Sequence, residues 1–159
     1  MNKKEIRCTL NGQKTTLHAY PMARLLDVLR EYNLTGAKEG CGEGECGACS
    51  IFLNGVIVNS CLIPAAQAEG SEMTTIEGIA SDARTELAAP LHAVQQAFLE
   101  HGGAQCGICT PGMIMAAVAL FKKNPHPNDA EIREGLAGNL CRCTGYTKIF
   151  AAVVKACRT

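Results

Sequence analysis

The chain has 159 residues, and its 15 lysines and arginines balance its 15 aspartates and glutamates, so its formal net charge is zero. A neutral chain lacks the basic field with which nucleic-acid-binding proteins attract phosphates. It also lacks the acidic excess that often steers a freely diffusing electron carrier toward basic partners. This length fits one domain or two small ones.

Ten cysteines in so short a chain would suit a disulfide-rich protein, but only in an oxidising compartment. The first residues, MNKKEIR, are not followed by an apolar stretch and predict no secretory signal. No segment approaches the ~18 consecutive apolar residues of a membrane span. We therefore expect a cytoplasmic protein in which clustered thiols are metal ligands.

The first half has the pattern of a small mixed sheet packed on one helix. Apolar runs flank Asn-Gly pairs at 11–12 and 54–55, and Asn-Gly between two such runs is a strong predictor of a β-hairpin. Between the hairpins, leucines on one helical face predict a helix over 22–32. These leucines are Leu25, Leu26 and Leu29.

The first set of four cysteines lies in this half. It has the spacing C-x4-C-x2-C followed by a more distant cysteine, which is typical of a plant-type ferredoxin 2Fe-2S site. Glycines between the ligands allow unusual φ values and let backbone N–H groups point at the sulfurs. They also match GxGxxG, but no βαβ unit surrounds them, so we reject a dinucleotide site. The cysteines are Cys41, Cys46, Cys49 and Cys61, and the glycines are Gly42, Gly44 and Gly47.

The second half changes to helical periodicity and predicts four short helices. The first follows Pro90, the second opens at Thr110-Pro111, and the third begins with a capping box formed by Asn128 and Glu131. Gly138-Asn139 supplies a stop for the third helix. The apolar stripes are Leu91, Val94, Phe98 and Leu99; then Ile114, Ala117, Val118 and Phe121; then Ile132 and Leu136; and last Ile149, Val153 and Cys157. Residues 79–89 lack apolar periodicity and predict a linker.

The second cysteine set consists of a C-x2-C pair before the second helix and a C-x-C pair between the third and fourth. Zinc also uses four thiolates, so a structural zinc site remains an alternative, more for this set than for the first. Rieske ligation is disfavoured because no histidine lies close to a cysteine as a ligand pair. The cysteines are Cys106, Cys109, Cys141 and Cys143; the histidines, expected to be surface residues, are His18, His92, His101 and His126; Cys8 and Cys157 are expected to be small buried side chains.

Three segments, GCGEGECGACS with Cys61 downstream, QCGICTPGM and GNLCRCTGY, resemble the iron-sulfur subunit of the molybdenum hydroxylases, the xanthine dehydrogenase and aldehyde oxidoreductase family. The likeness extends from about residue 6 to about residue 155. It implies an α+β chain with an N-terminal β-grasp ferredoxin-like domain at 1–78, a linker at 79–89 and a C-terminal four-helix-bundle 2Fe-2S domain at 90–159. Each cysteine set would hold one 2Fe-2S cluster.

The same resemblance implies that the chain is an electron-transfer subunit. Gln105 and Cys143 would approach the pterin of a molybdenum cofactor in a large partner subunit, and Glu43, Gly44 and Glu45 would face a medium FAD subunit. Single electrons would pass from molybdenum through the second cluster and then the first to FAD or another acceptor. The expected substrate of the complex is an N-heterocycle of purine or nicotinate type, with aldehydes or aromatic compounds as alternatives. A stand-alone ferredoxin-type carrier and a zinc-stabilised interaction module are the rival functions.

Overall fold

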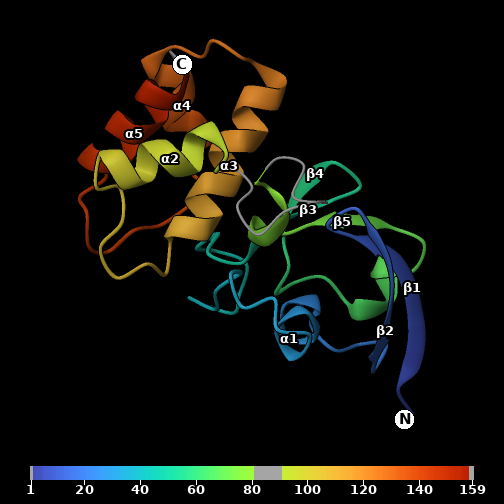
Figure 1. The fold of residues 1–159 in the computed structure, drawn as a ribbon. Coiled ribbons are helices and arrows are strands. Elements are labelled where there is room, and N and C mark those ends of the chain that lie inside the picture. Colours follow the sequence, from blue (N-terminus) through green and yellow to red (C-terminus); the bar gives the residue numbers. More distant parts are fainter. Residues whose placement is uncertain (1, 81–90, 158–159) are drawn as a thin grey trace.

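The computed structural model describes residues 2–80 and 91–157. Within these residues the protein is a mixed α+β structure in which a five-stranded sheet and helix α1 lie beside a group of four helices, α2 to α5 (Figure 1). The strands are β1 Lys4–Leu10, β2 Gln13–Ala19, β3 Ser50–Leu53, β4 Val56–Asn59 and β5 Glu72–Thr74. The helices are α1 Leu25–Glu31, α2 Ala93–Glu100, α3 Thr110–Lys123, α4 Asp129–Gly135 and α5 Thr147–Cys157, with short 3-10 turns at Ala65–Ala68 and Ile76–Gly78.

Both predicted hairpins are present. Strand β1 pairs antiparallel with β2 around residues 11–12, and β3 pairs antiparallel with β4 around 54–55. In each turn the asparagine has φ 51° and the glycine φ 79°. Two successive positive φ values are the requirement of a type I′ turn, which explains why Asn-Gly occupies both sites.

The central strand, β5, was not predicted from the sequence. The sheet order is β2-β1-β5-β3-β4, with β5 parallel to β1 and antiparallel to β3. The turn asparagines hold it: Asn54 Oδ1 accepts a bond of 2.8 Å from the Glu72 amide, and Asn11 Oδ1 accepts one of 2.9 Å from the Thr75 amide. A three-residue strand is too short to show a period of two, so its pairing depends on neighbours distant in the chain.

Helix α1 begins at Leu25, three residues later than predicted. Arg24 is extended (φ −63°, ψ 131°) and forms an isolated antiparallel bridge with Pro64. The Leu25 amide donates to the Ile63 carbonyl at 2.8 Å. This tertiary pairing keeps the residues before Leu25 out of the helix although their side chains fit a helical pattern.

The four helices predicted in the second half are all present, and the predicted Asn128–Glu131 capping box is formed. A second capping box, which the sequence did not reveal, starts α2: His92 Nδ1 accepts from the Val94 amide at 3.2 Å, and Gln95 bonds back to the His92 amide. Helix α4 ends at Gly135, before the predicted stop at 138–139. No helix of the described residues is long and apolar enough to cross a membrane.

Of the predicted linker at 79–89, residues 81–89 lie outside the described residues. Ile79 is buried and packs into the apolar core of the helices. The division into domains at 1–78 and 90–159 stays a prediction.

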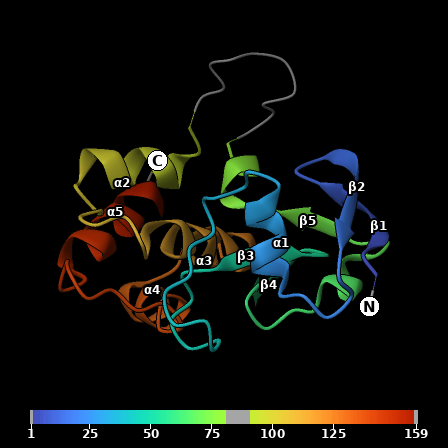
Figure 2. The same ribbon diagram turned by 90° about the horizontal axis from the view of Figure 1, so that it is seen from below.

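Strand β3 joins the two apolar cores. Ile51 points into the core shared by the sheet and α1, whereas Phe52 belongs to the core of the helices, and both are buried. Helix α3 packs along this strand (Figure 2). Lys122, near the end of α3, places its Nζ 4.1 Å from the centroid of the Phe52 ring, a cation–π distance. A strand buried on both faces explains the continuous apolar run at 51–53.

The first turn of α3 lies directly against the first cysteine loop. A Cβ atom at Gly112 would collide with the carbonyl oxygen of Gly47 and approach the Asn139 side chain. Gly112 therefore permits backbone contact between the two halves of the protein.

We predict that Gly112→Ala destabilises the protein although alanine normally favours a helix interior by about 1 kcal/mol. The collision should cost ~1–3 kcal/mol and lower the midpoint of thermal unfolding by several degrees. Gly138→Ala is the matched control, because a Cβ atom there meets no heavy atom within 4 Å. An unchanged midpoint for Gly112→Ala would contradict the close contact.

Candidate functional site

All ten cysteines lie in the described residues and are free thiols. The two predicted sets are each assembled, and within each set the thiols approach one another in pairs. In the first set Cys41 neighbours Cys46, and Cys49 neighbours Cys61. In the second set the pairs are Cys106 with Cys143 and Cys109 with Cys141.

This paired arrangement bears on which metal group fits. Among the described residues, no three His, Cys, Asp or Glu side chains converge on one point as the ligands of a single metal ion. Four thiolates on one zinc ion would have to surround a common centre at ~2.3 Å. A 2Fe-2S cluster has two irons, each bound by two cysteines, and two neighbouring pairs of thiols per set are compatible with such a cluster.

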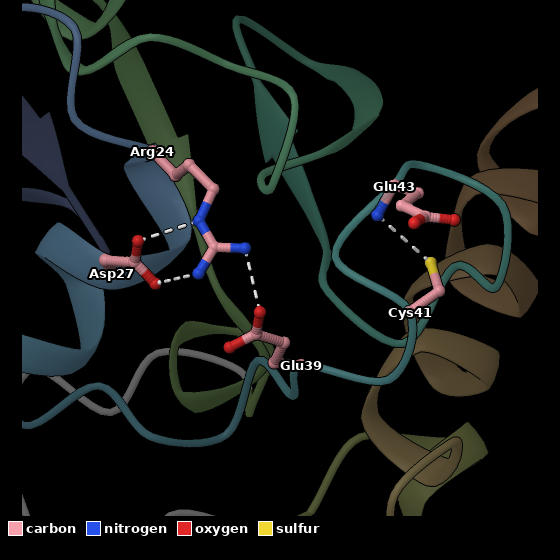
Figure 3. A network of polar contacts seen from close by, with 5 residues as sticks. All are labelled: Arg24, Asp27, Glu39, Cys41 and Glu43. Atoms are coloured by element: carbon pink, nitrogen blue, oxygen red, sulfur yellow. Dashed lines mark hydrogen bonds and ion pairs between the residues drawn. The ribbon is translucent and has the colours of Figure 1, made fainter.

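The backbone of the first cysteine loop is shaped by its glycines. Gly42, Gly44 and Gly47 have φ values of 74°, 82° and 67°, in the left-handed region that favours glycine. The loop turns the amides of Glu43 and Cys46 toward Cys41 Sγ, each at 3.4 Å, and Figure 3 shows the bond from Glu43. The sequence had predicted this use of the glycines.

The amides change the acidity of the exposed Cys41 thiol. The hydrogen bond from the Glu43 backbone, followed by those from Cys46 and Glu45, lowers the pKa of Cys41 to about 7. A thiolate is the form that binds metal, so the loop is organised for a negatively charged sulfur.

An ion-pair network anchors the loop to the start of helix α1. Arg24 donates to both carboxylate oxygens of Asp27 at 2.8 and 2.9 Å, and its Nη1 donates to Glu39 Oε1 at 2.7 Å (Figure 3). Glu39 lies two residues before Cys41. Because the groups are partly exposed, we expect the network to position the loop more than to stabilise the fold.

The inner thiols of both sets are buried. The pKa of Cys61 is raised to about 11, chiefly by burial and to a smaller extent by the neighbouring Cys49 thiol. The pKa of Cys109 is raised to about 12, chiefly by burial and to a smaller extent by the neighbouring Cys141 thiol. These thiols favour the neutral form unless a positive charge is bound beside them, which is what a metal centre supplies.

The second set contains a hydroxyl in contact with a sulfur. Thr144 Oγ1 lies 3.1 Å from Cys141 Sγ, and the Thr144 amide donates to the same sulfur at 3.5 Å. Burial alone would raise the pKa of Cys141, but the bonds from Thr144 and from the Cys143 amide outweigh it and lower that pKa to about 7.

One buried hydroxyl beside this set has no partner. Thr110 follows Cys109 directly, and its Oγ1 is the one buried side-chain oxygen or nitrogen of the described residues that lacks a hydrogen bond. Such groups are rare in native proteins and call for a missing partner. The sulfur atoms of a cluster held by Cys109 would be suitable acceptors, so the residues present fit the group.

The predicted partner-facing residues other than the half-buried Gly44 are exposed. Gln105, Cys106 and Cys143 are exposed in the second set, and Glu43 and Glu45 are exposed in the first. Each set therefore has buried thiols on one side and accessible groups on the other.

The cysteines outside the two sets behave differently from each other. Cys8 is buried, as predicted, and desolvation raises its pKa. Cys157 is only partly buried, and its thiol donates to the Pro125 carbonyl at 3.6 Å. The expectation of a buried side chain was wrong for Cys157, which is the last residue of α5.

Asn139 is the residue of this region whose role was missed from the sequence. It was interpreted as a helix stop, but its buried side chain donates to the Gly47 carbonyl at 2.9 Å. The next amide, that of Leu140, donates to the Cys46 carbonyl at 3.0 Å. These bonds join the first cysteine loop to the segment that carries Cys141. The one available signal was the position of Asn139 two residues before a cysteine.

Comparisons with protein families match nearly the whole chain. Residues 8–77 match the model of a 2Fe-2S iron-sulfur cluster binding domain, and residues 75–154 match that of a 2Fe-2S binding domain. Each match contains one of the two cysteine sets.

Similar proteins cover the chain from end to end. It is 53% identical to the nicotinate dehydrogenase small FeS subunit of Eubacterium barkeri, over 96% of this chain and 94% of that protein. It is 47% identical to the xanthine dehydrogenase iron-sulfur-binding subunit of Escherichia coli O157:H7, over 100% of this chain and 99% of that protein. Among solved structures, a chain of quinoline 2-oxidoreductase from Pseudomonas putida 86 superposes with a TM-score of 0.91 at 39% sequence identity. The superposition covers 99% of this chain and 96% of that chain.

We predict that alkylation of the cluster-free protein by iodoacetamide distinguishes the thiols of the first set. With a pKa of about 7, Cys41 is about nine-tenths thiolate at pH 8 and about one-tenth at pH 6, so its labelling should slow roughly tenfold as the pH falls. Cys61, with its raised pKa, should react slowly at both pH values. Peptide mass spectrometry provides the rates, and equal labelling of the two thiols would contradict the described loop.

Proposed function

Since the chain belongs to the iron-sulfur small subunits of the molybdenum hydroxylases, the family of xanthine dehydrogenase and aldehyde oxidoreductase, we propose that it relays single electrons from a molybdenum cofactor through two 2Fe-2S clusters to FAD or another acceptor. The observation that carries the proposal is the gathering of the eight thiols in two sites whose loops are hydrogen-bonded to each other.

The proposed ligands are the two predicted sets. One cluster would be held by Cys41, Cys46, Cys49 and Cys61 in a β-grasp ferredoxin-like domain, and the other by Cys106, Cys109, Cys141 and Cys143 in a four-helix bundle. Each cluster, when bound, accepts and releases one electron at a time. The protein contributes the thiolates, directs backbone amides at Cys41 and excludes water from Cys49, Cys61 and Cys109.

The accessible residues of the two sets are compatible with a relay that starts at the second site. The exposed Gln105 and Cys143 would contact the pterin of a large molybdenum subunit, so the second site would receive the electron first. The bond from the Leu140 amide to the Cys46 carbonyl then gives a short connection to the first site. The exposed Glu43 and Glu45, with Gly44 between them, would face a medium FAD subunit.

The substrate of the proposed complex is an N-heterocycle of purine or nicotinate type. The relatives named for nicotinate, xanthine and quinoline support this choice, because all three compounds are N-heterocycles. A cytoplasmic location is part of the proposal, because clustered cysteines that hold metal rather than form disulfides are typical of a reducing compartment.

The experiment that tests this function is metal analysis of the complex purified natively from its own cells. About four irons per chain together with molybdenum are expected, because two 2Fe-2S clusters contain two irons each. Cys46→Ser should hold roughly half the iron, and Cys157→Ser, outside the proposed ligands, should retain all of it. Iron without molybdenum would indicate a stand-alone carrier, and zinc without iron would contradict the redox function.

A separate prediction concerns the entry point of the electron. Gln105→Ala should retain both clusters but slow reduction of the second by substrate, because the side chain is exposed beside Cys106 and available to a partner's pterin. Stopped-flow absorbance measures the rate, and Gln96→Ala, on the exposed face of α2, is the control. Reduction at the wild-type rate would show that Gln105 does not contribute to this step.

A further inference from the structure

The segment from Cys141 to Tyr146 folds back on itself through its own hydrogen bonds. The Cys141 amide donates to the Tyr146 hydroxyl at 2.9 Å, and the Tyr146 amide donates to Thr144 Oγ1 at 3.1 Å. Thr144 Oγ1 in turn lies 3.1 Å from Cys141 Sγ. The three contacts form a closed chain that begins and ends at Cys141.

The backbone is strained to make this closure. Gly145 has φ 61° and Tyr146 has φ 66°, and an aromatic residue in the left-handed region is uncommon. Such conformations persist where surrounding contacts hold them and often mark functional sites. Here the Tyr146 ring stacks on Phe150, with centroids 6.1 Å apart, and Arg133 lies 4.7 Å above the Phe150 ring. The packing of α4 and α5 therefore fixes the Tyr146 amide on Thr144.

Within this chain of contacts, the Thr144 hydroxyl has one suitable hydrogen-bond acceptor, the Cys141 sulfur. A hydroxyl has one hydrogen and two lone pairs, and one lone pair of Thr144 already accepts the Tyr146 amide. In the contact with Cys141 either partner could donate while the cysteine is a thiol. A cysteine bound to metal has lost its proton. Thr144 must then be the donor.

We propose that Thr144 is a positioning residue whose hydroxyl donates to the Cys141 sulfur and thereby raises the reduction potential of the second cluster. This inference rests on the proposed function. An electron added to a cluster held here would come from the partner's reduced centre, and the hydroxyl proton would stay on Thr144. A hydrogen bond to a ligand sulfur stabilises the added negative charge, so it favours the reduced state. Thr144 would thus make the second cluster a better electron acceptor.

The test is a redox titration of the iron-loaded complex monitored by EPR, in which the signal that survives in Cys46→Ser identifies the second cluster. Thr144→Val removes the hydroxyl with little change in shape, and we expect a lower potential that changes the one-electron equilibrium by about threefold to tenfold, where ~59 mV corresponds to tenfold. Thr144→Ser should restore the potential to within about twofold of wild type. Thr147→Val is the control, because Thr147 is exposed. The first cluster, titrated in the same sample, should not shift.

A second measurement, which does not need the valine variant, guards against loss of the cluster in that variant. Pulsed EPR of the reduced second cluster should detect a strongly coupled proton that exchanges in D2O, and Thr144→Ser should retain it. An unchanged potential in a fully iron-loaded Thr144→Val, or no exchangeable proton in the wild type, would overturn the role of Thr144 and leave the relay intact. Absence of any iron signal from the wild-type complex would overturn the proposed function together with this inference.

Discussion

The contact between the two cysteine loops is the constraint on which the rest of the structure depends. The carbonyls of Cys46 and Gly47 accept bonds from the Leu140 amide and the Asn139 side chain. A Cβ atom at Gly112 would collide with Gly47, so the halves approach at backbone distance. Backbone and buried side-chain bonds allow little variation in length. They hold the two thiol sets in one fixed relation, which an electron relay requires and which separate, loosely linked modules would lack.

The thiols themselves are treated unequally, and the difference follows their position. The exposed Cys41 receives amide hydrogen bonds that favour its thiolate, whereas burial keeps Cys61 and Cys109 neutral until a metal binds. Cys141 is partly buried yet has a lowered pKa because Thr144 compensates for the lost solvent. Local hydrogen bonding therefore sets the charge on the sulfurs, and by the same physics it should set the electron affinity of a bound cluster.

Two threonine hydroxyls lie beside the second cysteine set, and one of them has hydrogen-bond partners whereas the other has none. The Thr144 hydroxyl is bonded and is oriented by a strained turn, whereas the Thr110 Oγ1 atom, next to Cys109, is buried without a hydrogen-bond partner. A buried hydroxyl without a partner costs about 1–3 kcal/mol, so its presence is understandable if a bound group accepts its hydrogen bond. Both features lie close to the accessible Cys143 and Gln105, where the proposed large subunit would dock.

The sequence by itself determined the hairpins and the four C-terminal helices, because Asn-Gly turns, capping boxes and apolar periodicity are local signals. Ligand spacing, which is also local, predicted the two cysteine sets. Tertiary structure alone decided the late start of α1, the insertion of β5 between β1 and β3, and the use of β3 by both cores. It also decided the thiol pairing, the role of Asn139 at the junction and the contact of Thr144 with Cys141. These depend on groups brought together by folding. A three-residue strand or a single asparagine has no periodicity to read, and a hydrogen bond across ninety residues leaves no mark on the local sequence pattern.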